Sequence, residues 1–337
     1  MEWLIANGGI ESVPLYNCSA LTSAEWSLQH GVKKPIWGSL DLAYGIIIEI
    51  LYIPCLIVIA SKEYFAHSCF KIMFFLGIVD MAAIGVNSII TGWLLVEGAV
   101  FCTYPNFIFI SGSFGLGLWC TACLICLLLV VNRLMDMLEY SKTYSDYIFH
   151  GWRTYFILLL CFIYGGYFFF FTPPVVFASK YVAWFFDPFI FPDRSLEYQN
   201  PLHSANNLFL VGFTCVLYGV FCVAVGRRLR QTFTESTGQR KLHNQIFIQS
   251  TLICLVNFFA SVIYVVMQFI PVPDFFIALG HMGWQFGHGC PAVIYLVMNR
   301  TIRNGVLRLL RLKAAKSRRI TGTGGSHGHH SDTTKPL

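Results

Sequence analysis

Seven long apolar segments constrain this chain more than any other feature of its sequence. They lie at roughly 37–60, 69–95, 105–132, 152–172, 205–227, 244–270 and 275–298. A helix needs about 20 apolar residues to cross the ~30 Å hydrocarbon core of a bilayer, and each segment has that length. Because the apolar runs are continuous and show no two-residue alternation, they predict helices rather than the strands of a barrel. We therefore expect an all-α membrane protein, a bundle of seven transmembrane helices.

The overall composition agrees with a membrane protein and excludes several other classes. Hydrophobic residues make up 56% of the 337 residues and charged residues only 12%, whereas soluble domains contain about 25% charged residues. This excludes a soluble enzyme and an intrinsically disordered chain. Residues 1–36 carry neither the basic start nor the short apolar core of a signal peptide, so we expect the first span to direct insertion.

The positions of lysine and arginine predict how the bundle is oriented. Of the 23 Lys and Arg residues, 19 flank the spans on one side and four on the other. Because basic residues concentrate in cytoplasmic loops, residues 1–36 are predicted to be extracellular and residues 37–298 to form the transmembrane domain. The net charge of +6 is then explained by anionic lipid head groups of the bilayer, and no nucleic-acid partner is expected.

Two different segments follow the last span. In residues 299–313 apolar positions such as Ile302 and Val306 alternate with Arg at helical spacing, which predicts a short amphipathic helix along the inner leaflet. Residues 314–337 are rich in Gly, Ser, Thr and His, a composition typical of a disordered cytoplasmic tail.

The predicted outer side carries two candidate covalent features. Asn17-Cys18-Ser19 is a glycosylation acceptor, so Asn17 is a candidate glycan site. Ten of the 12 cysteines lie in or at the edge of spans, and only Cys18 and Cys102 face the oxidising side. We predict that these two form a disulfide; the alternative is two unpaired thiols, since sequence alone does not fix connectivity.

Carboxylates inside the spans are the first candidate functional groups, because ionisable residues are costly in a bilayer. Asp80 lies deep in the second span. It either takes part in function or ties helices together as a hydrogen-bonded carboxyl, and the two interpretations carry equal weight. Glu49 lies near the centre of the first span, where a hydrogen bond to a neighbouring helix is the favoured role.

Polar and aromatic residues of the seventh span form a second candidate group. His281 and His288 are two helical turns apart and share a face with Trp284 and Gln285. That spacing is too long for both imidazoles to chelate one metal ion. We therefore expect these four residues to line a ligand pocket or to make hydrogen bonds between helices, and we expect no metal and no cofactor.

A long connection of roughly residues 173–204 joins the fourth and fifth spans. It contains the aromatic run 184–189, Trp-Phe-Phe-Asp-Pro-Phe, and too many proline and polar residues to cross a membrane. Such a loop either folds over the mouth of the bundle as a lid or packs on the membrane surface.

Seven spans, an extracellular N-terminus, Asp80 in the second span and Arg133 at the inner end of the third resemble a G-protein-coupled receptor. More specifically, nearly the whole chain resembles the nematode serpentine chemoreceptors of class T. Four segments carry that similarity: residues 9–18 (GIESVPLYNC), 48–55 (IEILYIPC), 184–189 (WFFDPF) and 280–291 (GHMGWQFGHGCP).

The resemblance implies roles for particular residues. Arg133 would contact the G protein in the active state, and Asp80 would anchor an inner polar network that rearranges between states. Pro291 and Tyr295 would form the inner switch of the seventh helix, although three residues separate them here where the superfamily usually has two. Asn132 replaces the acid that usually precedes the arginine, so no ionic latch to the adjacent residue is expected.

These observations predict a chemosensory receptor rather than an enzyme. It would bind an extracellular small molecule among helices three, five, six and seven and activate a heterotrimeric G protein at the plasma membrane, in the cilia of sensory neurons if the resemblance holds. One alternative is an intramembrane zinc hydrolase built on Asp80, His281 and His288. Another is a channel or transporter that uses Glu49 and Asp80.

Overall fold

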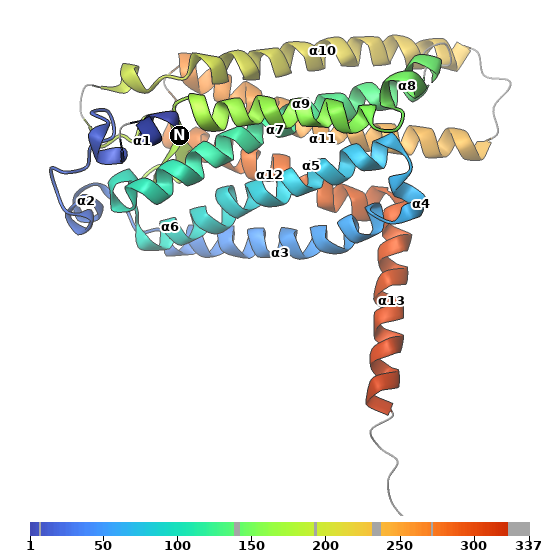
Figure 1. Ribbon diagram of the computed structural model, residues 1–337, viewed down its shortest axis with the longest axis horizontal. Coiled ribbons are helices and arrows are strands. Elements are labelled where there is room, and N and C mark those ends of the chain that lie inside the picture. The colour runs from blue at the N-terminus through green and yellow to red at the C-terminus, as the bar shows by residue number, and fades with distance from the viewer. Residues whose placement is uncertain (7, 138–141, 192–193, 231–236, 271, 323–337) are drawn as a thin grey trace, which may run out of the picture.

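The computed structural model describes the chain except residues 7, 138–141, 192–193, 231–236, 271 and 323–337. Long helices run side by side through the described part and form one elongated bundle (Figure 1). In chain order the seven spans are α3 (Pro35–Ile59), α5 with η2 and α6 (Ser68–Ile84, Gly85–Ile90, Thr91–Glu97), α7 (Pro105–Met137), α9 (Arg153–Phe171), α10 (Pro201–Arg230), α11 (Thr237–Phe269) and α12 (Asp274–Met298). The third, fifth, sixth and seventh spans are thus α7, α10, α11 and α12.

Length and composition support membrane insertion directly for part of the bundle. Within the described residues, the helices that are long and apolar enough to cross a membrane are Pro35–Ile59, Ser68–Glu97, Pro105–Asp136 and Trp152–Phe171. Of these, α7 is the most enclosed and α9 the least, which places α7 inside the bundle and α9 at its edge. The helices α10, α11 and α12 pack against this group and complete the bundle.

Small residues let some helices approach backbone to backbone. A Cβ atom added to Gly92 of α6 would lie 2.6 Å from the carbonyl oxygen of Gly38 in α3. Likewise, a Cβ atom on Gly117 of α7 would lie 2.8 Å from the carbonyl oxygen of Gly165 in α9. Close contacts of this kind replace the hydrophobic effect as the source of helix association in lipid.

The second span is interrupted by a π-helical segment. In η2 the backbone makes a wider turn than in the α-helices before and after it, and Val86, Asn87 and Ser88 of this segment are buried. The Thr91 hydroxyl donates a hydrogen bond to the Val86 carbonyl oxygen at 3.0 Å. Such π-bulges occur frequently at functional sites, and this one lies next to α7 and α12.

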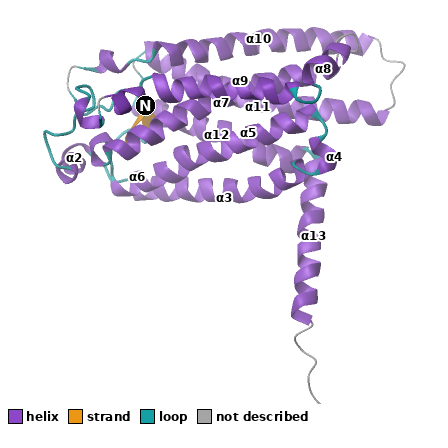
Figure 2. Ribbon diagram, in the orientation of Figure 1, coloured by secondary structure: helices purple, strands orange, loops and turns teal. Residues whose placement is uncertain are grey.

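Short elements connect the spans at both ends. At the end that carries the N-terminus are α1 (Glu2–Ala6), η1 (Ile10–Ser12), α2 (Ser23–His30), η3 (Phe101–Thr103) and η5 (Ser195–Tyr198). The strands β1 (Val176–Ala178) and β2 (Ala183–Phe185) lie at the same end and pair antiparallel, with Phe177 opposite Trp184 (Figure 2). At the opposite end are α4 (Lys62–Phe65) and α8 (Lys142–Phe149). We call the first end the outer end and the second the inner end, following the predicted orientation.

The last helix, α13 (Arg300–Gly322), leaves the inner end and runs across the direction of the bundle (Figure 1). Ile302 and Val306 are buried against the bundle, as the predicted amphipathic pattern requires. The helix continues past the predicted end at residue 313 as far as Gly322. Residues 323–337 of the predicted tail lie outside the described residues.

Candidate functional site

A disulfide and aromatic packing fasten the N-terminal segment to the outer end of the bundle. Cys18 and Cys102 form a disulfide with their Cα atoms 5.5 Å apart. The Trp26 indole donates a hydrogen bond to the Cys18 carbonyl oxygen at 2.9 Å. Tyr16 is fully buried, with ring contacts to Phe101 at 5.5 Å and to Tyr198 at 5.6 Å. This burial raises the pKa of the Tyr16 hydroxyl.

The connection between α9 and α10 is fastened to the same end. The Ser179 amide donates to the Ala99 carbonyl oxygen at 3.2 Å, which joins the hairpin to the end of α6. The Tyr198 hydroxyl donates to the Leu15 carbonyl oxygen at 2.6 Å, which joins the connection to the N-terminal segment. Burial raises the pKa of Tyr198 to about 12, so this hydroxyl stays a donor at neutral pH.

The aromatic run of this connection covers the bundle. Gly112 of α7 lies directly against the Val175 carbonyl oxygen, so the connection rests on the α7 backbone. Trp184 is buried, and its indole donates to the Thr91 hydroxyl oxygen at 2.8 Å. Phe189, in contrast, is 42% exposed. The first three aromatic residues of the run 184–189 therefore form a lid, the first of the two alternatives for this loop.

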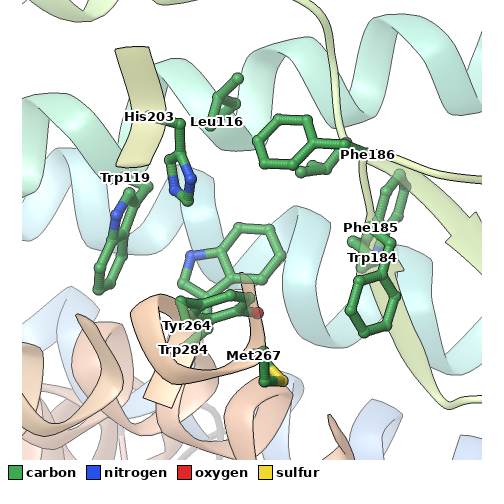
Figure 3. A pocket seen from close by; sticks show the side chains of 10 residues that line it. Leu116, Trp119, Trp184, Phe185, Phe186, His203, Tyr264, Met267 and Trp284 are labelled. Atoms are coloured by element: carbon green, nitrogen blue, oxygen red, sulfur yellow. The ribbon is translucent and has the colours of Figure 1, made fainter. Parts of the chain in front are cut away.

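A cavity of about 90 Å³ lies under the lid. Its walls come from four spans: Leu116 and Trp119 of α7, His203 of α10, Tyr264 and Met267 of α11, and Trp284 of α12. Its roof comes from the connection: Val175, Trp184, Phe185 and Phe186. Figure 3 shows the aromatic rings enclosing the space from several sides. Small-molecule sites are typically such apolar cavities with few polar groups.

The tryptophan and histidine nitrogens on the cavity wall fall into two groups. The Trp119 indole donates to the Asn207 side-chain oxygen at 3.0 Å, and the Trp184 indole is bonded as described. The Trp284 Nε1 and His203 Nδ1 atoms are buried and have no hydrogen-bond partner among the described residues. Of the four predicted pocket residues, Trp284 lines this cavity.

Next to the cavity, a buried polar network joins three spans. His288 Nδ1 lies 2.7 Å from Asp80 Oδ1. The Tyr52 hydroxyl lies 2.8 Å from Asp80 Oδ2 and 2.8 Å from the His288 carbonyl oxygen. A hydroxyl has one proton, so Tyr52 donates to only one of these acceptors at a time. The ring of Trp119 lies 6.0 Å from that of His288, so one side chain touches both cavity and network.

The other predicted pocket residues mainly hold helices together. Gln285 donates to the Asn87 carbonyl oxygen of the π-helical segment at 2.8 Å. His281 is 1% exposed and packs its ring 5.9 Å from that of Trp284, behind the cavity wall. For His288 and Gln285, the structure thus shows the second predicted alternative, hydrogen bonds between helices, rather than pocket lining.

The two candidate switch residues of α12 lie on the inner side of this network. Pro291 is inside the helix and has no amide proton, so the Gly287 carbonyl oxygen lacks its usual helical donor. Tyr295 is fully buried, and its hydroxyl has no partner among the described residues. This part of α12 therefore contains a backbone carbonyl without its helical donor and a buried hydroxyl without a described partner.

Arg133 lies at the inner end of α7 and is held by its own helix. Its guanidinium lies 3.3 Å from the Asp136 carboxylate and donates to the Asn132 side-chain oxygen at 3.0 Å. Ser145 of α8 donates to the other Asp136 oxygen at 2.7 Å. Asp136 therefore provides the carboxylate partner for Arg133 that the neutral Asn132 cannot provide. Sequence reasoning missed this latch, although the spacing of three residues on a helix was a readable signal.

The remaining candidates can also be placed. Asn17 lies on the outer end, and its side-chain oxygen accepts a hydrogen bond from the Ser19 amide at 2.8 Å. Glu49 is half-buried on α3. Among the described residues no group of three or more His, Cys, Asp or Glu side chains is arranged to hold a metal ion.

The structure thus combines a seven-helix bundle, a lidded cavity at one end and a basic residue at the inner end of the third span. Residues 3–319 match the family described as "Serpentine type 7TM GPCR chemoreceptor Srt", and the chain belongs to that family. It is also similar to serpentine receptor class T-55 of Caenorhabditis elegans. The two are 27% identical over 306 residues, which cover 90% of this chain and 82% of that protein.

Family membership confirms the predicted fold class and the resemblance stated from sequence. It also places the chain among chemoreceptors, which are not enzymes, so the zinc hydrolase alternative is set aside. The protein is a multi-pass membrane protein.

Proposed function

We propose that this chemoreceptor binds an extracellular small molecule in the lidded cavity and activates a heterotrimeric G protein at its inner end. The observation that carries the proposal is the position of Trp119. Its indole forms part of the cavity wall, and its ring also contacts His288 of the buried Asp80 network. A ligand that moves this ring therefore acts on the network without touching it.

The Asp80 network is the proposed relay. Tyr52 has two acceptors and one proton, so a small movement of α12 changes which acceptor it serves. Pro291 gives α12 a place to bend, and Tyr295 brings a buried hydroxyl to the same region. A ligand favours the active arrangement only by the difference in its affinity for the two states.

Arg133 is the proposed contact with the G protein. In this structure its charge is engaged by Asp136, which Ser145 holds from α8. Release of this latch would free the guanidinium, and an arginine with five donors is well suited to the polar surface of a partner. The lipid bilayer is the other constant partner, with α13 positioned to lie along its inner surface.

The outer end supports the same proposal. The disulfide between Cys18 and Cys102 keeps the roof segments in place, and a glycan on Asn17 would lie on this exposed end. We place the receptor in the plasma membrane, in the cilia of sensory neurons, where external molecules reach the lid.

A response assay tests the proposed function. Cells that express the chain are exposed to a broad panel of odorants and small metabolites while calcium and cAMP are recorded. We expect at least one compound to give a concentration-dependent response that is absent from cells lacking the receptor or the G protein. A response that survives removal of the G proteins would contradict the proposal and favour ion conduction.

Two substitutions on α7 locate the binding site. Leu116→Phe adds volume to a cavity of about 90 Å³ and should abolish the response, since overpacking a filled space costs about 1–3 kcal/mol. Ile110→Phe, at an exposed position of the same helix, is the matched control and should leave it unchanged. Equal responses from both variants, at equal surface expression, would place the ligand elsewhere.

A further inference from the structure

The size and lining of the cavity restrict its ligand first. Its volume of about 90 Å³ is smaller than the ~150 Å³ of a cavity that accepts benzene, a molecule of six non-hydrogen atoms, which limits the ligand to roughly four non-hydrogen atoms. None of the described lining residues is Asp, Glu, Lys or Arg. A charged ligand would lose its hydration without gaining a counter-ion, so the cavity favours an uncharged one.

Trp284 supplies one hydrogen-bond donor to this space. Its side chain is 5% exposed, and its Nε1 atom has no partner in the described part of the chain. An indole N–H only donates. The other two tryptophans of the cavity, Trp119 and Trp184, already donate to Asn207 and Thr91. Trp284 is therefore the tryptophan whose N–H is left for a ligand.

The protonation of His203 follows from its neighbours. Because the Trp119 indole only donates, the Asn207 atom that it contacts at 3.0 Å must be the amide oxygen. Asn206 also donates to that oxygen, at 3.2 Å. The remaining Asn207 atom is the NH₂ group, which lies 3.4 Å from His203 Nε2 and donates to it. A ring nitrogen that accepts carries no proton, so in neutral His203 the proton is on Nδ1.

His203 Nδ1–H is thus a second donor for which the described residues provide no partner, on a side chain that is 5% exposed. Figure 3 shows His203 and Trp284 on the wall of the same enclosed space, with Trp119 and Tyr264 beside them. Buried donors are rarely left unpaired, because each loses about 1–3 kcal/mol of hydration. Two such donors on one small cavity define what its occupant must offer.

We propose that the cavity selects small uncharged molecules that accept hydrogen bonds and do not need to donate them, such as ketones, aldehydes and esters. This rests on the proposed function of the cavity as the ligand site. The carbonyl oxygen lies between Trp284 Nε1–H and His203 Nδ1–H, and the hydrocarbon part packs on the aromatic walls. Hydrocarbons leave both donors unpaired, and alkylammonium ions bring further donors and a charge.

Three matched probes test this selectivity: acetone, isobutene and isopropylamine, which share a branched shape and the same number of non-hydrogen atoms. Each is equilibrated by dialysis with the purified full-length receptor in lipid nanodiscs. Binding to nanodiscs that hold the Leu116→Phe variant, whose cavity is filled, is subtracted to remove partition into lipid. We expect the ketone to bind roughly tenfold more tightly than the alkene, as one to two hydrogen bonds allow, and the amine not to bind.

Substitutions assign the donors. Trp284→Phe removes one N–H and should reduce the preference of ketone over alkene to roughly threefold or less, and His203→Phe should act in the same direction. Trp152→Phe is the matched control, because Trp152 is 69% exposed and does not line the cavity; it should retain the tenfold preference. The infrared carbonyl stretch of bound acetone should lie at lower frequency in the wild type than in Trp284→Phe.

Several results would overturn the inference: equal affinity for ketone and alkene, preferential binding of the amine, no specific binding of any probe, or an undiminished ketone preference in both the Trp284→Phe and the His203→Phe variants. The proposed function fails separately. Ketone binding with the expected selectivity, but without any G-protein response in cells, would contradict signalling and leave the ligand class supported.

Discussion

The two ends of the bundle are held together in different ways. At the outer end, segments far apart in the chain are joined by a disulfide and by hydrogen bonds to backbone carbonyls, as between Tyr198 and Leu15 and between Ser179 and Ala99. At the inner end of α7, the side chain of Arg133 contacts side chains of the described residues, and its charged partner Asp136 is three residues away on the same helix.

The links at the outer end suit a region that keeps a fixed shape, and those at the inner end suit a region that switches. Covalent and backbone links at the outer end keep the roof of a 90 Å³ cavity in one arrangement, which a small ligand needs to gain affinity. In the proposed function, the side-chain links at the inner end are the ones that change partners between the two states. The Asp80 network lies between these regions and contacts the cavity wall through Trp119 and His288.

The largest effect is expected from breaking the covalent link. Cys18→Ser opens a loop with a sequence separation of 84 residues, and the loss of that constraint on the unfolded chain should cost about 4 kcal/mol. We expect a lower melting temperature of the purified receptor and reduced surface expression. Cys215→Ser, at an exposed free cysteine, is the control. Equal melting of the two variants would show that the disulfide does not hold the outer end.

The second largest effect is expected from breaking the buried pair of Asp80 and His288. Asp80→Leu leaves His288 without its partner and should lower stability by about 3 kcal/mol, because a buried polar group then stays unpaired. The double variant Asp80→Leu with His288→Leu should recover part of that loss. Thermal melting of the single variants and the double variant measures the coupling. Additive losses would mean that the two side chains do not depend on each other.

The inner latch should have a smaller effect and appear in signalling rather than stability. Asp136→Asn should raise ligand-free signalling roughly fivefold, the population change for about 1 kcal/mol, because Arg133 loses its charged partner. Ser145→Ala should raise it less, since Ser145 acts through Asp136. Glu63→Gln, an exposed acid at the same end, is the control. Unchanged ligand-free signalling in Asp136→Asn would show that the ion pair between Arg133 and Asp136 does not restrain signalling.

The smallest effect concerns the outer helix α2. Hydrogen bonds from the Thr22 backbone and side chain hold the pKa of Glu25 below its usual 4.5. A carboxylate with a lowered pKa stabilises the folded helix above pH 4.5, and this contribution is lost as the pH falls through the lowered value. The protection factors of the α2 amides, which compare their exchange with the intrinsic rate at each pH, should therefore fall in acid, and Thr22→Ala should remove most of this pH dependence. Protection that does not change with pH would contradict the capping role.

The seven-helix bundle could be predicted from the sequence because membrane spans are local features. Each is a run of about 20 apolar residues, which can be identified without knowing what it packs against. The pairing of Cys18 with Cys102 could be predicted for a related reason, since the sidedness of the spans left few candidates. The lid was one of two alternatives, because aromatic residues serve a membrane surface as well as a cavity roof.

The residues that meet in the site were harder to predict from the sequence. Asp80 and His288 are 208 positions apart, and no local pattern pairs them. Trp119 and His203 belong to helices with many apolar and aromatic residues, so the face turned to the cavity could not be chosen from sequence. One signal was available: His203, Asn206 and Asn207 follow helical spacing in an apolar span, which marks a polar inner face.

The proposed function requires that ligand at the outer end and G protein at the inner end act on one equilibrium. Linkage requires that each partner raise the affinity for the other by the same factor. The most direct measurement is the affinity of reconstituted receptor for the most potent compound of the panel, with and without nucleotide-free G protein. We predict roughly tenfold tighter binding with G protein in the wild type, and no such increase in Arg133→Ala, whose affinity without G protein should match the wild type. An affinity that G protein does not change in the wild type would contradict the account.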